Sequence, residues 1–391
     1  HAIALTIKNI RPAVISAYPI TPQTHVVEDL AKFKADGEAD YEFLRAESEF
    51  AAASIVLGAS AAGSRVYTAT SSQGLLLMTE VIYNIAGLRL PVVMTCANRA
   101  ISAPINIWND QQDAMTVNDA GWIMLFAENN QEAVDQHVMA YKIAEKTRLP
   151  VMLNVDGFVL THTYEPVAIP DEKTIKKYLG NYKPKAGEYL DPANPVSMGL
   201  LGGPAHYMEI RQELHDNLIA SLKIINEEYN NYRKMIDNDR DAPRRVSTNT
   251  NNGLIEYYGP KNPETILVAA GSVVGTIKDA VDEKNPPSTP LNKGGKKEKT
   301  LFVKGGKGES VGVLKIKTYR PFPAEEIIKI LKPAKYVAII DKAITLGYMG
   351  PLAIDIKAAS QGKFNGKIQS FIVGLGGRDI TKEMIGKIIR E

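Results

Sequence analysis

The chain has 391 residues, which is enough for two or three domains with separate cores. Its 46 basic and 44 acidic residues give a net charge of +2, so bulk electrostatics offer no attraction to nucleic acid. The single cysteine, Cys96, excludes a disulfide framework and any cysteine-ligated iron–sulfur cluster held by this chain alone. Its apolar runs are too short to span a membrane, and we expect a cytoplasmic protein.

Two prolines flank Thr21 in the stretch "AYPITP" (17–22). Proline fixes its own φ and restricts the residue before it, so this segment is stiff and extended and holds the Thr21 hydroxyl in place. A rigid loop without any chemistry would have the same composition.

A run of uncharged residues follows Glu49. Residues 50–63 are almost all Ala, Gly, Ser and aliphatic, which predicts a close-packed, buried helix. Glu49 therefore places a carboxyl group, which is expensive to bury, at the start of this helix. Attraction to the helix dipole would by itself explain both Glu47 and Glu49.

The first half of the chain alternates short apolar runs with helical patterns. The runs at 65–70, 90–97 and 149–157 are bounded by turn residues, as buried parallel strands are. Helical spacing covers 74–88 and 130–148. The alternation predicts an α/β fold with a doubly wound parallel sheet, in which ligands bind at the carboxyl ends of the strands.

Polar side chains follow two of these predicted strands. Arg99 lies past the run at 90–97, where its planar fork suits a carboxylate, although a structural salt bridge would also explain it. Ser72 and Gln73 precede a helix whose free amides favour an anion, and helix capping fits equally well. The polar cluster at 109–114 predicts a turn, and no residue spacing predicts a metal site.

The second half of the chain predicts one long helix and a second α/β unit. Apolar side chains at three- and four-residue steps over 206–236 predict an amphipathic helix of about eight turns. The polar segment 237–253 predicts a linker, and strand–helix patterns resume at 265–283. The lysine- and glycine-rich stretch 284–309 predicts a solvated loop. The glycines of "GLGGRD" (374–379) resemble a phosphate-binding loop, which is weak evidence in isolation.

Several of these motifs together resemble a known family. "AYPITP", "RAESEFAAASIVLGASAAG", "CANRA", "DQQDAM", "TYRPFP" and "GLGGRDIT" are similar, in this order, to the α subunit of pyruvate:ferredoxin oxidoreductase. The wider family of 2-oxoacid:ferredoxin oxidoreductases uses thiamine diphosphate. The resemblance implies a pyrimidine-binding domain with a helical extension and linker over 1–250, and a smaller transketolase-C-like α/β domain over 251–391.

The resemblance also implies roles for particular residues. Glu49 matches the acid whose carboxyl group hydrogen-bonds N1′ of the cofactor's aminopyrimidine, and Ser72 and Gln73 would contact the same cofactor. Thr21 and Arg99 match residues that hold the carboxylate of a 2-oxoacid. The implied reaction is the oxidation of pyruvate with coenzyme A to acetyl-CoA and CO2, with electrons passed to ferredoxin, or its reverse.

The motifs that are missing imply partner subunits. The chain has no Gly-Asp-Gly motif for Mg²⁺ and diphosphate, since "VDGF" (155–158) lacks the first glycine. The resemblance therefore implies a β subunit that holds Mg²⁺ and diphosphate. It further implies a γ subunit and a ferredoxin-like δ subunit, with [4Fe-4S] clusters on partner subunits only.

Alternatives remain open. The same chemistry on 2-oxoglutarate, a branched-chain 2-oxoacid or oxalate fits the same motifs. A transketolase or decarboxylase without redox partners is a further possibility. A different class of protein, a non-catalytic scaffold subunit that binds an acidic partner through 284–309, is disfavoured by the presence of Glu49, Thr21 and Arg99.

Overall fold

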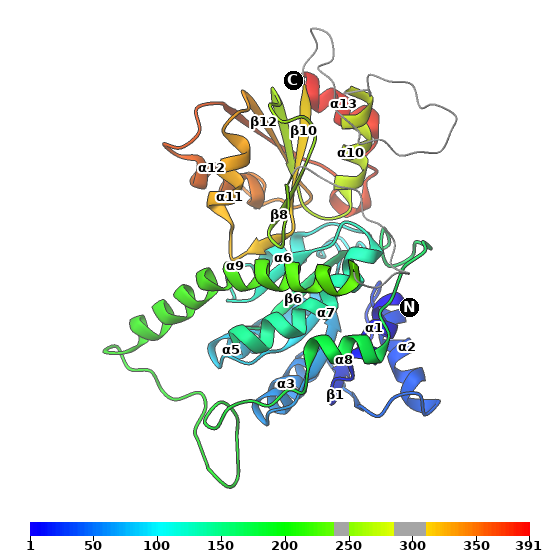
Figure 1. The fold of residues 1–391 in the computed structure, drawn as a ribbon, viewed down its shortest axis with the longest axis vertical. Helices are drawn as coiled ribbons and strands as arrows, with labels where there is room; N and C mark the ends of the chain where they lie inside the picture. The colour runs from blue at the N-terminus through cyan, green and yellow to red at the C-terminus, as the bar shows by residue number, and fades with distance from the viewer. Residues whose placement is uncertain (238–249, 285–309) are drawn as a thin grey trace.

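The computed structural model describes residues 1–237, 250–284 and 310–391. Two sheets with helices on their faces form two stacked units, and the second unit lies above the first in Figure 1. Of the described helices, none is both long and apolar enough to cross a membrane.

The first sheet confirms the predicted doubly wound α/β fold. Its strand order is β11-β5-β6-β4-β3-β1-β2, and β1 to β6 are parallel. These six strands are β1 (Val14–Ala17), β2 (Glu42–Arg45), β3 (Val66–Thr70), β4 (Val93–Asn98), β5 (Ile123–Phe126) and β6 (Val151–Asp156). Strands β3, β4 and β6 are the three predicted from continuous apolar runs, and every residue in them is buried.

Helices cover both faces of this sheet. They are α1 (Ala2–Ile10), α2 (Thr24–Ala35), α3 (Glu49–Ala61), α4 (Ser72–Leu77), α5 (Thr79–Gly87), α6 (Gln112–Thr116), α7 (Asn130–Thr147) and α8 (Glu172–Leu179). Helices α3, α4 and α5 contact one another, whereas α1 contacts α2, α7 and α8. The helix predicted at 74–88 is divided in two at Met78.

Helix α3 is buried along one face only. Ala52, Ala53 and Val56 are buried against the sheet, whereas the Phe50 side chain and Gly58 are exposed. The prediction of a buried helix is therefore correct for the face of α3 toward the sheet and wrong for the opposite face. The small residues on the open face cannot be told from core residues by composition, because the one hydroxyl there, that of Ser54, bonds back to the Phe50 carbonyl and small hydroxyl residues also occur in cores.

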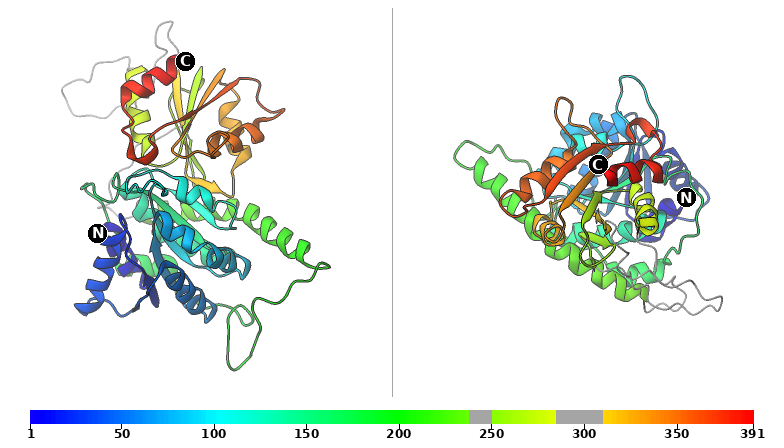
Figure 2. Two further views of the ribbon diagram at one scale, coloured as in Figure 1. Left: turned by 180° about the vertical axis from the view of Figure 1, so that it is seen from behind. Right: turned by 90° about the horizontal axis from the view of Figure 1, so that it is seen from above.

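The long helix predicted at 206–236 is α9 (Tyr207–Asp237). It packs on α7, where the Tyr232 hydroxyl donates to Asp135 Oδ1 at 2.9 Å. Its first turns project beyond the first unit, as Figures 1 and 2 show. Of the polar segment 237–253, residues 238–249 lie outside the described residues.

The second sheet has the strand order β13-β12-β9-β10-β8-β7. Its strands are β7 (Thr250–Asn251), β8 (Ile255–Tyr258), β9 (Thr265–Ala269), β10 (Val311–Ile316), β12 (Tyr336–Asp341) and β13 (Lys367–Ile372). Helices α10 (Val273–Lys284), α11 (Ala324–Leu331), α12 (Pro351–Ser360) and α13 (Lys382–Arg390) pack around it. The lysine-rich stretch lies outside the described residues apart from Lys284. The domain boundary at 250/251 stays a prediction.

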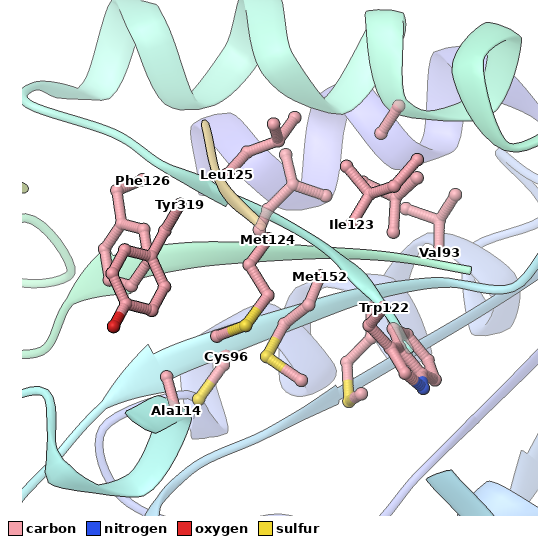
Figure 3. Close-up of a cluster of buried hydrophobic side chains, with 14 of the residues drawn as sticks. Val93, Cys96, Ala114, Trp122, Ile123, Met124, Leu125, Phe126, Met152 and Tyr319 are labelled. Carbon is pink, nitrogen blue, oxygen red and sulfur yellow. The ribbon is translucent and has the colours of Figure 1, made fainter. Parts of the chain in front are cut away.

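One strand crosses between the two units. Strand β11 (Thr318–Arg320) follows β10 directly in sequence, yet it pairs antiparallel with β5 at the edge of the first sheet. Tyr319 is buried there, and its ring meets Phe126 edge-on with centroids 6.1 Å apart (Figure 3). The sequence pattern assigns this run to the second unit, because pairing with a distant strand leaves no mark on local periodicity.

The carboxyl ends of the two sheets meet at Asp156, the last residue of β6. Its carboxylate accepts hydrogen bonds from Lys342 Nζ at 2.9 Å, Gln111 Nε2 at 3.1 Å and the Ser272 amide at 2.9 Å. A Cβ at Gly271, which has φ +80°, would lie 2.6 Å from Gln111 Nε2 and 2.9 Å from Asp156 Oδ2. Only glycine therefore fits where the two sheets approach most closely.

A second group of buried charges lies between the units. Lys315 on β10 binds Glu128 and Glu132 of the first unit at 2.7 Å and 2.8 Å, and Glu256 on β8 at 3.3 Å. Burial alone would raise the pKa of Glu132, but Lys315 and Lys317 outweigh it and lower that pKa to about 2. Lys315 thus pairs with two acids of the first unit across the junction and with one acid of its own sheet.

We predict that Asp156→Asn lowers the free energy of unfolding by about 3 to 5 kcal/mol, because Lys342 would stay buried without its counter-ion. Burial tends to raise the pKa of Asp156, but Lys342 and the hydrogen bonds lower it below its ordinary value. The contribution to stability is therefore present above the ordinary carboxyl pKa and is lost as the pH falls through the lowered one. Urea unfolding from neutral to strongly acidic pH measures both effects.

The control is Glu283→Gln, which removes the exposed Lys382–Glu283 ion pair. Solvent screens this pair, so stability should hardly change. If Asp156→Asn and Glu283→Gln lowered the free energy of unfolding equally, the buried ion pair at Asp156 would contribute no more than an exposed one, against the prediction.

Candidate functional site

The predicted site residues gather at the carboxyl edge of the first sheet. The chain passes from β1 to β2 on one side and then returns to β3 on the other side of β1, so the strand order reverses there. Ligands of doubly wound sheets bind outside such a reversal. Thr21, Glu49, Ser72 and Arg99 all follow the carboxyl ends of β1, β2, β3 and β4, respectively.

Glu49 is nearly buried, and its carboxyl group has no partner among the residues that the structure describes. It is the first residue of α3, and the helix is capped by the preceding Ser48, whose hydroxyl accepts from the Ala51 amide at 3.1 Å. The Glu49 side chain is 8% exposed and makes no hydrogen bond or ion pair with any described residue. A carboxyl group in this position is costly unless a ligand satisfies it.

Gly74 brings the backbone of α4 against this carboxyl group. A Cβ at Gly74 would lie 2.7 Å from Glu49 Oε1 and 2.5 Å from Thr70 Oγ1. The buried hydroxyls of Thr70 and Ser71 also lack a hydrogen-bond partner among the described residues. The Glu49 carboxyl group and the Thr70 and Ser71 hydroxyls can therefore each form hydrogen bonds with a ligand near Gly74.

Ser72 and Gln73 are the first two residues of α4, directly after the turn at Ser71. Ser72 is buried with φ +48°, and its hydroxyl donates to the Ala100 carbonyl and lies 2.5 Å from Gln73 Oε1. The Ser72 hydroxyl therefore ties this turn to the loop after β4. Ser71 is the N-cap of α4 but makes no capping hydrogen bond, so side-chain capping does not account for the turn. The predicted cofactor contacts of Ser72 and Gln73 stay predictions.

The structure brings Arg99 and Thr21 together, and their predicted role in holding a carboxylate stays a prediction. Arg99 Nη1 donates to the Thr21 carbonyl at 2.9 Å, and Nε donates to the Asn106 carbonyl at 3.1 Å. The Arg99 residue is 7% exposed and its guanidinium forms no ion pair with a described carboxylate, which removes the salt-bridge explanation. Burial lowers the pKa of Arg99, yet a guanidinium stays charged at neutral pH. Its remaining donors can therefore bind an anion.

Asp113 connects the two halves of the site, and sequence reasoning missed it. Its Oδ2 accepts from the amides of Ser72 and Arg99, both at 2.9 Å, and Oδ1 accepts from Asn98 Nδ2 at 3.0 Å. Burial raises the pKa of Asp113 to about 6, although these hydrogen bonds oppose the shift. Two sequence signals were available: Asp113 lies in a polar cluster, which predicted a turn, and in the motif "DQQDAM", which gave it no role.

The glycine-rich loop at 374–379 does not present its amides to a phosphate. The Gly376 amide donates to Asp110 Oδ2 at 3.1 Å, and the Gly377 amide donates to the Asn109 carbonyl at 2.7 Å. A Cβ at Gly377 would clash with the Trp108 side chain. The resemblance to a phosphate loop is wrong for these two amides. In the described part of the chain, no three His, Cys, Asp or Glu side chains are placed to hold a metal ion.

Comparisons with known proteins agree on one family. A family model described as pyruvate flavodoxin/ferredoxin oxidoreductase, thiamine diphosphate-binding, matches residues 6–231, and pyruvate:ferredoxin oxidoreductase core domain II matches 303–385. The chain is 46% identical to pyruvate synthase subunit PorA of Methanocaldococcus jannaschii, over 96% of this chain and 89% of the relative. It is 37% identical to ketoisovalerate oxidoreductase subunit VorA of Pyrococcus horikoshii, over 97% and 89%.

A solved structure supports the fold. The 2-oxoglutarate:ferredoxin oxidoreductase from Magnetococcus marinus superposes with a TM-score of 0.66 at 18% identity, and that structure has 2-oxoglutarate, coenzyme A and succinyl-CoA bound. The match covers all of this chain but only 63% of the solved chain. Similarity at this level shows a common fold.

We predict that Gly74→Ala destabilises the protein by about 1 to 3 kcal/mol, as overpacking in a rigid site does. The added methyl group would meet Thr70 Oγ1 and Glu49 Oε1 at 2.5 and 2.7 Å. The matched control is Gly58→Ala on the open face of α3, where a Cβ has nothing within 4 Å. There the higher helix propensity of alanine should raise stability by up to about 1 kcal/mol. Thermal unfolding of both variants measures the difference, and a neutral Gly74→Ala would refute the close approach.

Proposed function

The chain belongs to the pyruvate:ferredoxin oxidoreductase family, and we propose that it is the α subunit of a complex that oxidises pyruvate. The products are acetyl-CoA and CO2, coenzyme A takes the acetyl group, and the electrons pass to ferredoxin. The same complex can run in reverse as a pyruvate synthase. The observation that carries the proposal is the partnerless Glu49 carboxyl group beside Gly74, at the strand-order reversal where a ligand binds.

The residues around Glu49 fit the aminopyrimidine ring of thiamine diphosphate. That ring presents hydrogen-bonding nitrogens on one edge and flat faces. Glu49 offers an unused carboxyl group, Thr70 and Ser71 offer unused hydroxyls, and Gly74 leaves no side chain in the way. Bound thiamine diphosphate supplies a nucleophilic carbon and accepts the electrons left behind when CO2 departs.

Glu49 acts on the cofactor by holding a proton at N1′. The residue is only 8% exposed, so a bound aminopyrimidine would displace what little water reaches the carboxyl group. Ser48 already caps the helix, so the Glu49 carboxyl group is free for this single task. Helix α4 begins at Ser72, whose φ is +48°, and this backbone conformation sets how closely α4 approaches the Glu49 carboxyl group.

Arg99 binds the carboxylate of the 2-oxoacid. Two carbonyl groups, of Thr21 and Asn106, orient its guanidinium, and no protein carboxylate neutralises it among the described residues. A substrate carboxylate would restore charge balance at this buried position through charge-assisted hydrogen bonds. The exposed Thr21 side chain lies next to the arginine and can contribute its hydroxyl.

Partner subunits complete the proposed enzyme. A β subunit would bind Mg²⁺ and the diphosphate, and γ and δ subunits would complete the complex, with [4Fe-4S] clusters held by partners. Support comes from this chain's composition, since one cysteine cannot ligate a cluster and no Gly-Asp-Gly motif is present. The exposed face of α3, including Phe50, offers an apolar surface beside Glu49 for the β subunit. We expect the complex to be cytoplasmic.

A related substrate is the second candidate. The similarity to a ketoisovalerate oxidoreductase subunit keeps branched-chain 2-oxoacids in consideration, because Arg99 recognises only the carboxylate that all 2-oxoacids share. A non-catalytic scaffold is a poorer fit. A scaffold would have no use for an acid without a hydrogen-bond partner and an arginine without an ion pair, among the described residues, at one edge of the sheet.

We predict that Glu49→Gln leaves folding and assembly intact but lowers turnover about a hundredfold or more, the scale of a lost proton-transfer group. Exchange of the proton at C2 of bound thiamine diphosphate for deuterium should slow in parallel. The control is Glu47→Gln, two residues earlier and exposed, which should behave as the unmodified protein does. Normal C2 exchange in Glu49→Gln would remove Glu49 from this role.

Arg99→Lys keeps the positive charge but loses the bidentate fork, and we predict a loss of about 1 to 3 kcal/mol in transition-state stabilisation. Thr21→Val retains the carbonyl that Arg99 binds and should have a milder effect. The measurement is kcat/KM of the assembled complex for pyruvate, 2-oxoglutarate and branched-chain 2-oxoacids. Pyruvate should give the highest value, and the arginine variant should lower all of them. A higher kcat/KM for another 2-oxoacid would show that this acid, and not pyruvate, is the substrate. Unchanged kcat/KM values in Arg99→Lys would show that Arg99 does not bind the substrate carboxylate.

A further inference from the structure

Asp113 is the most completely hydrogen-bonded acid near the site, and no step assigned so far uses it. It is fully buried in the first turn of α6. Besides the amides of Ser72 and Arg99 and the Asn98 side chain, it accepts from its neighbour's amide, that of Ala114, at 2.7 Å. Within the described residues its carboxylate meets N–H and S–H donors and no cation at salt-bridge distance.

The donors to Asp113 belong to the two segments that carry the site. The Ser72 amide begins α4, and Gly74 lies two residues later against Glu49. The Arg99 amide ends β4, and its side chain reaches Thr21. One carboxylate oxygen, Oδ2, receives both amides at 2.9 Å. Asp113 Oδ2 therefore fixes the distance between the start of α4, near the proposed cofactor position, and Arg99, which would bind the substrate.

The backbone at Ser72 shows that this contact is needed. Ser72 has φ +48°, a left-handed conformation that a residue with a side chain rarely adopts unless its surroundings hold it. In this conformation its amide points at Asp113, and its hydroxyl reaches the Ala100 carbonyl just past Arg99. The turn and the strand end are thus tied together twice, once through Asp113 and once directly.

We propose that Asp113 is a positioning residue for both halves of the site. Its ionised carboxylate holds the β3–α4 turn, which keeps Gly74 against Glu49, and it holds the strand end from which Arg99 reaches the substrate. The identity of the ligands that the two halves bind rests on the proposed function. The claim that the Asp113 carboxylate sets the spacing of the two halves rests on the structure alone.

The test uses Asp113→Asn, which keeps the shape but replaces one acceptor oxygen by a donor, and Asp113→Ala, which removes both acceptors. Hydrogen–deuterium exchange of the full chain, resolved to single amides, reports on the Ser72 and Arg99 amides directly. We expect both amides to exchange about tenfold faster or more in Asp113→Ala, the scale of one lost hydrogen bond to a charged group, with a smaller change in Asp113→Asn. Amides within β6 and α7 should keep their rates.

Kinetics of the assembled complex provide the second measurement. Displacement of Arg99 should raise KM for the 2-oxoacid and displacement of Gly74 and Glu49 should lower kcat, so both constants should change by about tenfold or more. The control is Asp110→Asn, a buried acid in the same segment whose oxygen binds Gly376 instead. It should leave the exchange of the Ser72 and Arg99 amides unchanged.

Three results would overturn the proposal: unchanged exchange at both amides, faster exchange throughout the first domain, or faster local exchange with unchanged KM and kcat. If Asp113→Ala fails to fold, the isosteric Asp113→Asn decides the question by the same criteria. A complex that does not act on pyruvate would refute the proposed function while leaving the exchange result intact, so the two failures can be told apart.

Discussion

Asp156 joins the two sheets, because its carboxylate binds groups that follow strands in both. Carboxyl ends of parallel strands carry loops and polar groups, and bringing two such edges together buries those groups. Lys342 supplies the compensating charge, Ser272 and Gln111 supply further donors, and Gly271 gives the room for close approach. This buried ion pair and its hydrogen bonds hold the carboxyl edges of the two sheets together, beside the Lys315 ion pairs and the β11–β5 pairing.

The junction reaches the site through the segment 106–111. Lys342 also donates to the Asn109 side chain, and Asn109 Nδ2 donates to the Asn98 carbonyl at 3.2 Å. Asn106 Nδ2 donates to the Gly376 carbonyl at 3.1 Å, while its own carbonyl accepts from Arg99. The second domain thus helps to orient an arginine that belongs to the first. The second domain contributes none of the predicted site residues, and these hydrogen bonds explain how it can still affect the site.

Periodicity and strand ends predicted much of this molecule. Buried parallel strands appear in the sequence as continuous apolar runs, and ligands of such sheets bind at the carboxyl ends of the strands, which made Arg99 a candidate. The resemblance to a known family was needed to choose between a ligand-binding role and a structural role for Arg99 and Glu49. Three features could not be found in this way. Strand β11 leaves its own sheet for another, the glycines at 376 and 377 pack on residues 108–110, and Asp113 binds amides from two other segments. Each depends on contacts between residues far apart in sequence, which local patterns do not encode.

The buried charges of the described residues differ in how they are compensated. Lys315 and Asp156 each face an opposite charge, and Asp113 is surrounded by donors. Glu49 and Arg99 are also nearly buried, yet neither has an ion pair among the described residues. Leaving a buried charge uncompensated lowers stability, and a protein retains such a cost where a bound molecule removes it. Glu49 offers a carboxyl group and Arg99 offers a guanidinium, so this edge suits one molecule with a hydrogen-bonding ring nitrogen and a second molecule with a carboxylate.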